Sequence, residues 1–75
     1  MEFNPKMLVE LVTMRMPFGK HKGVILSELP VSYLEWFNRE GFPEGKLGQL
    51  LETLLVIKAN GLEEILMQLK KMKRN

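Results

Sequence analysis

Five leucines spaced three and four residues apart constrain the fold of this chain more than any other feature. They stand at positions 47, 50, 51, 54 and 55, the spacing i, i+3, i+4, i+7, i+8 that places side chains on one face of an α-helix. This apolar face is wider than one neighbouring helix can cover. We therefore expect either that several elements of the same chain surround this helix, or that part of its face forms an interface.

The chain has little besides packing to stabilise a core. It contains 75 residues and no cysteine, so neither a disulfide nor a thiolate metal site can supplement that core. A core of this size leaves self-association open. If the leucine face joins two copies as a homodimer, the expected interface comprises Leu47, Leu51, Leu54, Leu55 and Leu66. The alternative is that these side chains are buried within one monomer.

Capping residues indicate where two other helices begin. Asn4 is a candidate N-cap and Pro5 suits the first helical position, which predicts a first helix that ends near Thr13. Ser32 and Glu35 have the spacing of a capping box and predict the start of a second helix.

Glycines indicate where the second and third helices end. Gly41 and Gly61 each follow an apolar helical pattern and precede an apolar residue, as in a Schellman motif. A last helix from about Leu62 is expected to fray into a tail at residues 73–75.

The segment between the first two helices has a different composition. Pro17 and two glycines surround the basic Lys20-His21-Lys22, which favours a turn between extended segments. We predict a β-hairpin with strands at 15–18 and 24–26. The fold class is therefore expected to be α+β: one small, mostly helical domain with an N-terminal helix within 1–13, the β-hairpin over 14–28, three helices over 29–72 and the tail at 73–75.

The predicted hairpin tip carries the most suggestive surface chemistry. Arg15, Lys20 and Lys22 are positively charged, His21 lies beside them, and no acidic residue stands between positions 15 and 22. Glycines at a turn expose backbone N–H groups, and the cations add further donors to an anion. We therefore predict that these four residues contact nucleic-acid phosphates. The alternative is that the lysines only keep the edge of the hairpin soluble.

The aromatic residues allow two interpretations. Tyr33, Trp36 and Phe37, with Phe18, could stack on nucleic-acid bases. A short chain needs its aromatic side chains in the core, however, so we expect Trp36 and Phe37 to be buried and Tyr33 to show a polar edge.

The residue inventory argues against catalysis and metal binding. The chain has no aspartate and one histidine, which removes a Ser-His-Asp triad and Asp-rich metal clusters. His21 alone cannot supply the three or four donors that zinc requires. We expect no enzymatic activity, no catalytic residue, no metal and no cofactor, and the sequence indicates no small-molecule ligand.

The sequence also indicates a soluble, cytoplasmic protein. Its first residues lack the pattern of a secretory signal. The longest unbroken apolar run, at positions 54–57, is far shorter than the roughly 20 residues that cross a bilayer. No membrane partner is expected.

Several motifs between Met16 and Glu63 resemble a family of small bacterial proteins. They are Pro17-Phe18-Gly19-Lys20, Lys22-Gly23, Leu29-Pro30, Tyr33-Leu34, Trp36-Phe37, Gly41-Phe42-Pro43, Gly45-Lys46-Leu47-Gly48 and Asn60-Gly61-Leu62. The family is labelled putative quorum-sensing-regulated virulence factor and is otherwise a domain of unknown function. It commonly has an aromatic residue at the position of His21. The label implies a regulatory context rather than a mechanism.

The first half of these motifs also resembles a short module that follows the nuclease domain of exonuclease X-like enzymes. That resemblance implies a nucleic-acid setting without nuclease activity, because the carboxylate-rich catalytic domain is absent from these residues. We therefore expect a non-enzymatic module that binds nucleic acid through the basic tip. The alternative is a protein interaction or homodimerisation domain that acts through the leucine-rich C-terminal helices.

Overall fold

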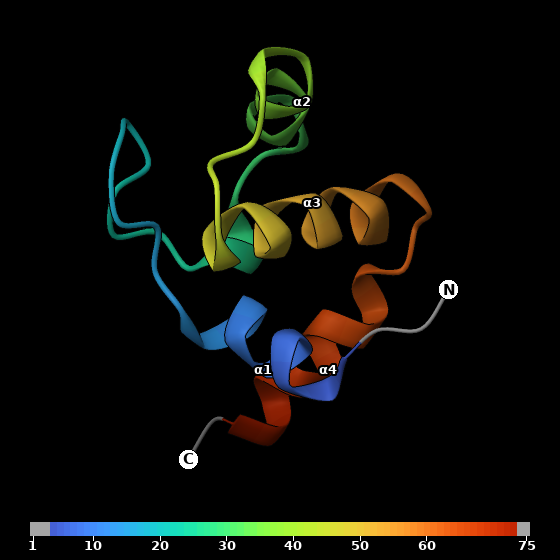
Figure 1. Cartoon of the computed structure of the whole chain (residues 1–75). Helices are drawn as coiled ribbons and strands as arrows, with labels where there is room; N and C mark the ends of the chain where they lie inside the picture. Colours follow the sequence, from blue (N-terminus) through green and yellow to red (C-terminus); the bar gives the residue numbers. More distant parts are fainter. Residues whose placement is uncertain (1–3, 74–75) are drawn as a thin grey trace.

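Residues 4–73 are the part of the chain that the computed structural model describes, and they form four α-helices and one short 3-10 helix (Figure 1). These elements are α1 (Pro5–Thr13), η1 (Leu26–Glu28), α2 (Val31–Glu40), α3 (Lys46–Ala59) and α4 (Glu63–Lys73). The expected tail is wrong at its first residue, because Lys73 belongs to α4. Its remaining residues, 74–75, lie outside the described part.

Helix α3 occupies the centre of the fold. Figure 1 shows α2 on one side of it and α1 on the other, with α4 packed against α1. Leu50, Leu51, Leu54 and Ile57 of α3 are fully buried. The other buried apolar side chains are Leu11, Val12, Met16, Leu26, Leu29, Leu34, Phe37 and Leu66. Several elements of one chain thus surround the leucine face.

The start of α1 was predicted correctly and that of α2 was not. The Asn4 side chain accepts a hydrogen bond from the Lys6 backbone N–H at 2.8 Å, and α1 ends at Thr13 as expected. Helix α2 begins one residue before Ser32, and the predicted capping box is absent. Pro30 takes the N-cap position instead, because its φ of −65° and ψ of 146° lead into the helix and its carbonyl accepts the Tyr33 N–H at 3.1 Å.

The predicted helix ends are confirmed. After α3, the Leu62 N–H donates to the Ile57 carbonyl at 2.9 Å and the Gly61 N–H to the Lys58 carbonyl at 3.3 Å, the bonding pattern of a Schellman motif. Gly61 has a φ of +67°, which glycine adopts without strain. After α2, Gly41 ends the helix as predicted, but the Schellman motif expected there is absent: the Gly41 N–H donates to the Phe37 carbonyl at 2.7 Å, an ordinary helical bond, and its φ of 109° and ψ of 129° are not those of a left-handed cap.

The predicted β-hairpin is wrong, and with it the α+β fold class, because residues 4–73 contain helices and no strand. The two arms of the segment pair through a single antiparallel bridge between Arg15 and Ile25. Met16 donates its N–H to the Val24 carbonyl and accepts from the Gly23 N–H, both at 2.8 Å.

Two features stop this pairing from growing into strands. The Val24 N–H donates to the His21 carbonyl at 3.1 Å rather than across to Met16, so the ladder ends there. On the other arm η1 begins at Leu26, so the extended part that could pair as a strand is limited to Val24 and Ile25. The segment is therefore a long loop, closed at its base by one bridge.

An exposed ion pair connects η1 to α4 and gives a prediction about pH. Lys70 donates a hydrogen bond to Glu28, and this bond together with the lysine charge lowers the pKa of Glu28 from its ordinary value of 4.5. Because the pKa is lower in the folded state, the stabilisation is present above the unfolded value and is lost as the pH falls through the folded value. We expect Glu28→Gln to lower the free energy of unfolding slightly at neutral pH and to have no effect in acid. Urea denaturation at a series of pH values measures this difference; a constant difference at every pH would contradict the role of the charge.

Across residues 4–73, no helix combines the length and the apolar character that crossing a bilayer requires.

Candidate functional site

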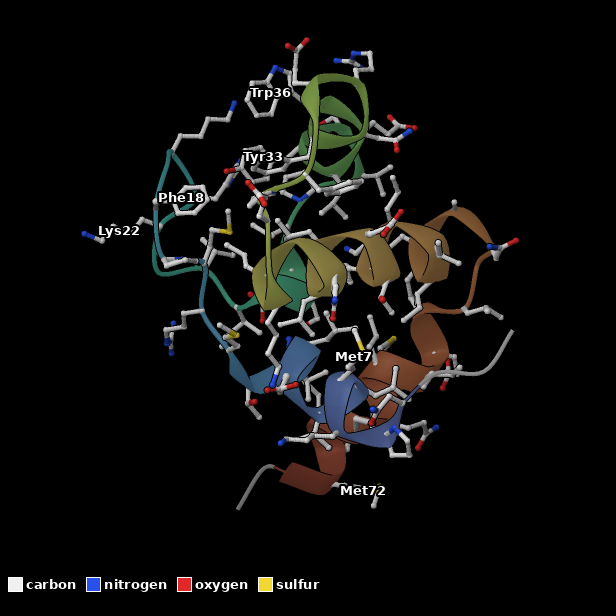
Figure 2. All side chains as sticks on the ribbon, in the orientation of Figure 1. Met7, Phe18, Lys22, Tyr33, Trp36 and Met72 are labelled. Atoms are coloured by element: carbon white, nitrogen blue, oxygen red, sulfur yellow. The ribbon has the colours of Figure 1, made fainter. Side chains whose placement is uncertain are left out.

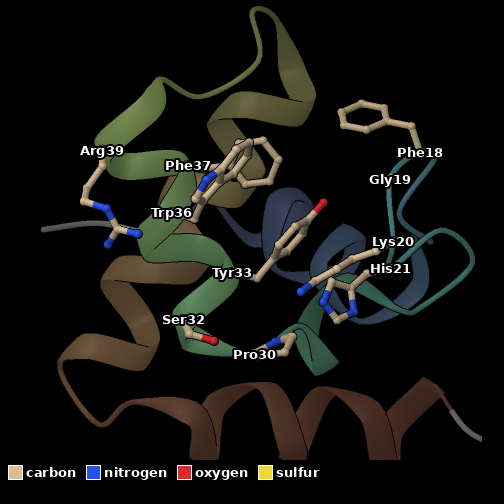
Figure 3. Close-up of a pocket in the computed structure, with 10 residues that line it drawn as sticks. All are labelled: Phe18, Gly19, Lys20, His21, Pro30, Ser32, Tyr33, Trp36, Phe37 and Arg39. Atoms are coloured by element: carbon tan, nitrogen blue, oxygen red, sulfur yellow. The ribbon is translucent and has the colours of Figure 1, made fainter.

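An open groove lies between the loop that follows α1 and the exposed side of α2 (Figure 3). Its volume is about 770 Å³, within the range of roughly 300–1,000 Å³ that is typical of ligand sites. It is lined by Phe18, Gly19, Lys20, His21, Pro30, Ser32, Tyr33, Trp36, Phe37 and Arg39. We refer to it as the α2 groove. None of its lining residues is acidic.

Aromatic side chains of α2 form one wall of the groove. The rings of Tyr33 and Trp36 are parallel within 4°, with centroids 6.5 Å apart. The Phe37 ring lies edge-on to both, and its centroid is 5.0 Å from each. These contacts hold the two parallel rings in a defined orientation.

The burial predicted for the aromatic residues is half right. Phe37 is 6% exposed, which confirms the prediction, whereas Trp36 is 47% exposed and the prediction of burial is wrong. Successive side chains of an α-helix point about 100° apart. Leu34 and Phe37 face the core, so Trp36, one residue before Phe37, is turned toward the groove. Tyr33 is half-buried.

The opposite wall of the groove is the loop, and glycine allows its close approach to Tyr33. Gly19 has a φ of +79°, and a Cβ added there would lie 3.0 Å from the Tyr33 hydroxyl oxygen. His21 packs against the Tyr33 ring with centroids 4.5 Å apart. At the base of the loop, the Arg15 guanidinium donates a hydrogen bond to the Gly23 carbonyl at 2.7 Å.

The four residues predicted to contact phosphates occupy three kinds of position. Lys20 and His21 line the groove (Figure 3). Lys22 is exposed on the same loop and points away from the body of the protein (Figure 2). Arg15 holds the base of the loop through its bond to Gly23. The structure thus brings two of the four predicted residues, Lys20 and His21, together in the groove.

Sequence reasoning missed Arg39, which with Lys20 makes a second cation in the groove lining. In Figure 3 it lies beyond Trp36, on the side away from Lys20 and His21. A signal for it exists in the sequence, because Tyr33, Trp36 and Arg39 recur every three residues and so follow one side of the helix. The groove therefore presents two aromatic rings between two cationic edges.

This arrangement suits an anion that also has flat apolar parts. Lysine and arginine donate hydrogen bonds to anionic oxygens, and parallel rings offer faces for stacking. Within residues 4–73, no three His, Cys, Asp or Glu side chains gather as metal ligands would.

The five leucines predicted to form a homodimer interface differ in exposure. Leu51 and Leu54 are fully buried and Leu66 is 3% exposed, all within the core of a single chain. Leu47 and Leu55 are partly buried and pack against that core. A second copy could reach only these last two without opening the fold, so homodimerisation through this face depends on them and stays a prediction.

Comparison with known proteins shows one family and two close relatives. A family model described as “Putative quorum-sensing-regulated virulence factor” matches residues 4–69, which include the whole α2 groove. Two relatives, from Escherichia coli strain K12 and Escherichia coli O157:H7, are both named “Uncharacterized protein YpeB”. Each is 48% identical to this chain over 65 residues, which cover 85% of this chain and 90% of the relative. No solved structure matches the chain.

Proposed function

The chain belongs to the family described as “Putative quorum-sensing-regulated virulence factor”, and we propose that it is a non-enzymatic module that binds nucleic acid through phosphate contacts at the α2 groove and its loop. One observation carries this proposal. Lys20, His21 and Arg39 line the same open groove, and no acidic side chain lines it with them. Lysine and arginine cations without an opposing carboxylate raise affinity for a polyanionic backbone, and a histidine beside them adds a hydrogen-bond donor.

Two further features support the proposal. The net charge is +2 with a sequence pI of about 9.1, which permits association with polyanions. The motifs that resemble the module following exonuclease X-like nuclease domains include Pro17-Phe18-Gly19-Lys20 and Tyr33-Leu34. These motifs supply residues of both groove walls.

Binding through phosphates predicts a salt dependence. The logarithm of the affinity should fall with the logarithm of the salt concentration, by about 0.7 to 0.9 per phosphate contacted. We expect the double variant Lys20→Ala/Lys22→Ala to flatten this slope by about 1.4 to 1.8, because it removes two contacts. Both side chains are exposed, so the variant should fold as the wild type does. The anisotropy of a labelled oligonucleotide between about 50 and 200 mM salt measures the slope.

The C-terminal residues provide the matched control. Lys71→Ala/Arg74→Ala also removes two positive charges, from the basic stretch at the end of the sequence. We expect this variant to keep a slope close to that of the wild type. A flatter salt slope in Lys71→Ala/Arg74→Ala alone would mean that the C-terminal residues, and not the groove, contact the phosphates. A lack of binding to any oligonucleotide at about 50 mM salt would overturn the proposal.

A further inference from the structure

Trp36 is unusually exposed for a large apolar side chain in a small protein. It is 47% exposed in a chain of 75 residues, although burying such a ring would add to the core. Phe18, on the loop wall of the same groove, is 44% exposed. Figure 2 shows both side chains on the same side of the molecule as Tyr33. Aromatic surface is thus concentrated at the α2 groove.

The exposed ring is also ordered by its neighbours. Tyr33 and Trp36, which we call the aromatic pair, are parallel within 4°, and the buried Phe37 supports both. Phe37 in turn stacks on Phe42, with centroids 6.2 Å apart. The two side chains are therefore already fixed before a ligand binds. A ligand that stacks on the aromatic pair has only a small entropic cost of immobilising them.

Cations lie at both ends of the aromatic pair. Lys20 and His21 reach it from the loop, and Arg39 follows Trp36 on α2 (Figure 3). Tyr33 and Arg39 are six residues apart, or about 9 Å along the helix axis. A strand laid along this line could place phosphates at the cations and its bases on the rings.

We propose that the α2 groove selects single-stranded nucleic acid by stacking unpaired bases on the aromatic pair. This inference rests on the proposed function and names its substrate class. Bases in a duplex are covered by their stacked neighbours and reach a protein ring only when they are flipped out. A single strand exposes its base faces, and aromatic side chains stack on them with little sequence preference. A duplex could use the cations of the groove but not Tyr33 and Trp36.

The charges of the groove favour this ligand over a proline-rich peptide. Aromatic-lined grooves also bind polyproline helices. The carbonyls of such a helix could accept hydrogen bonds from Lys20 and Arg39, but the helix has no charge of its own, so it gains no charge–charge attraction from them. A nucleic-acid strand uses both the rings and the cations.

Variants of Trp36 test the proposal. We expect Trp36→Ala to weaken binding of oligo(dT) or oligo(U) of about 12 nucleotides by about five- to one-hundred-fold. Trp36→Phe, which keeps an aromatic face, should restore most of that loss. Neither variant should change the salt slope, because neither removes a phosphate contact. Affinity for a duplex of the same length should be lower than for the single strand and should not respond to Trp36→Ala.

Two controls accompany this experiment. Met67→Ala removes another exposed apolar side chain, 56% exposed on α4, and should leave all affinities unchanged. Far-ultraviolet circular dichroism shows whether each variant is folded. Trp36 is the sole tryptophan, so its fluorescence in the wild type reports directly on the groove and should change on adding oligo(dT).

The outcomes separate this inference from the proposed function. Equal affinity for single strand and duplex, with no effect of Trp36→Ala and a slope that still responds to Lys20→Ala/Lys22→Ala, would overturn base stacking and keep phosphate binding. No binding of any oligonucleotide at about 50 mM salt would overturn both. A Trp36 fluorescence change with a polyproline peptide and none with oligonucleotides would overturn base stacking in favour of a peptide ligand at the aromatic pair.

Discussion

Replacing Gly48 by alanine should destabilise the protein by about 1–3 kcal/mol, the opposite of what this change does in most helices. In an exposed helix interior, alanine is more stable than glycine by about 0.5–1 kcal/mol. Gly48 is buried in the first turn of α3, where a Cβ would lie 1.8 Å from the Pro43 carbonyl oxygen and 2.9 Å from its carbonyl carbon. Both partners are backbone, so no rotation of a side chain can relieve the overlap. Overpacking of this kind costs about 1–3 kcal/mol and occasionally more.

Urea denaturation of Gly48→Ala and of Gln49→Ala measures this effect. Gln49 is exposed and stands in the same turn of α3, so its replacement should change the free energy of unfolding by no more than about 0.5 kcal/mol. A Gly48→Ala protein as stable as the wild type would mean that α3 does not pack on the Pro43 backbone.

This close approach also supports the α2 groove. Gly48 allows α3 to touch the segment that contains Phe42 and Pro43. Phe42 stacks on Phe37, and the Phe37 ring packs edge-on against Tyr33 and Trp36. A shift of the segment would therefore reach the aromatic pair through two ring contacts. If Gly48→Ala remains folded, we expect its affinity for single strands to fall. Its salt slope should stay close to that of the wild type, because the phosphate contacts remain.

The helices were predictable because their signals are local. Asn4, Pro5 and the glycine at position 61 act through backbone groups within one turn of the helix, so sequence spacing alone identifies them. The leucine periodicity identified α3 for the same reason. The α2 capping box failed because Pro30 started the helix before Ser32 could cap it.

The loop and the site depend on more than local pattern. The two extended arms around residues 17–23 resemble a hairpin in composition, but the turn bond from the Val24 N–H to the His21 carbonyl and the early start of η1 leave them with one bridge. The exposure of Trp36 depends on which side of α2 packs against α3. That choice is made by tertiary packing and cannot be predicted from the residues of α2 alone. Arg39 lies far from the basic loop in sequence and joins Lys20 only through the fold.

The adjacent residues Leu54 and Leu55 offer the largest expected difference between two matched substitutions. Leu54 is 0% exposed in the core, whereas Leu55 is partly buried at its edge. Leu54→Ala should lower the free energy of unfolding by about 2–5 kcal/mol, because it removes buried surface and leaves a cavity. A domain of this size has only about 4–11 kcal/mol of stability, at roughly 0.05–0.15 kcal/mol per residue. Leu54→Ala is therefore expected to bring the chain close to unfolding.

Leu55→Ala should cost much less, about 1 kcal/mol, if the leucine face belongs to a monomer. Both changes remove the same atoms from the same helix and give the same gain in helix propensity, so their difference reports burial alone. In a monomer neither unfolding midpoint depends on protein concentration. In a homodimer that covers Leu47 and Leu55, Leu55→Ala would cost nearly as much as Leu54→Ala, and the wild-type midpoint would rise with protein concentration. Denaturation at two protein concentrations, with sedimentation of the wild type at micromolar concentration, distinguishes these cases.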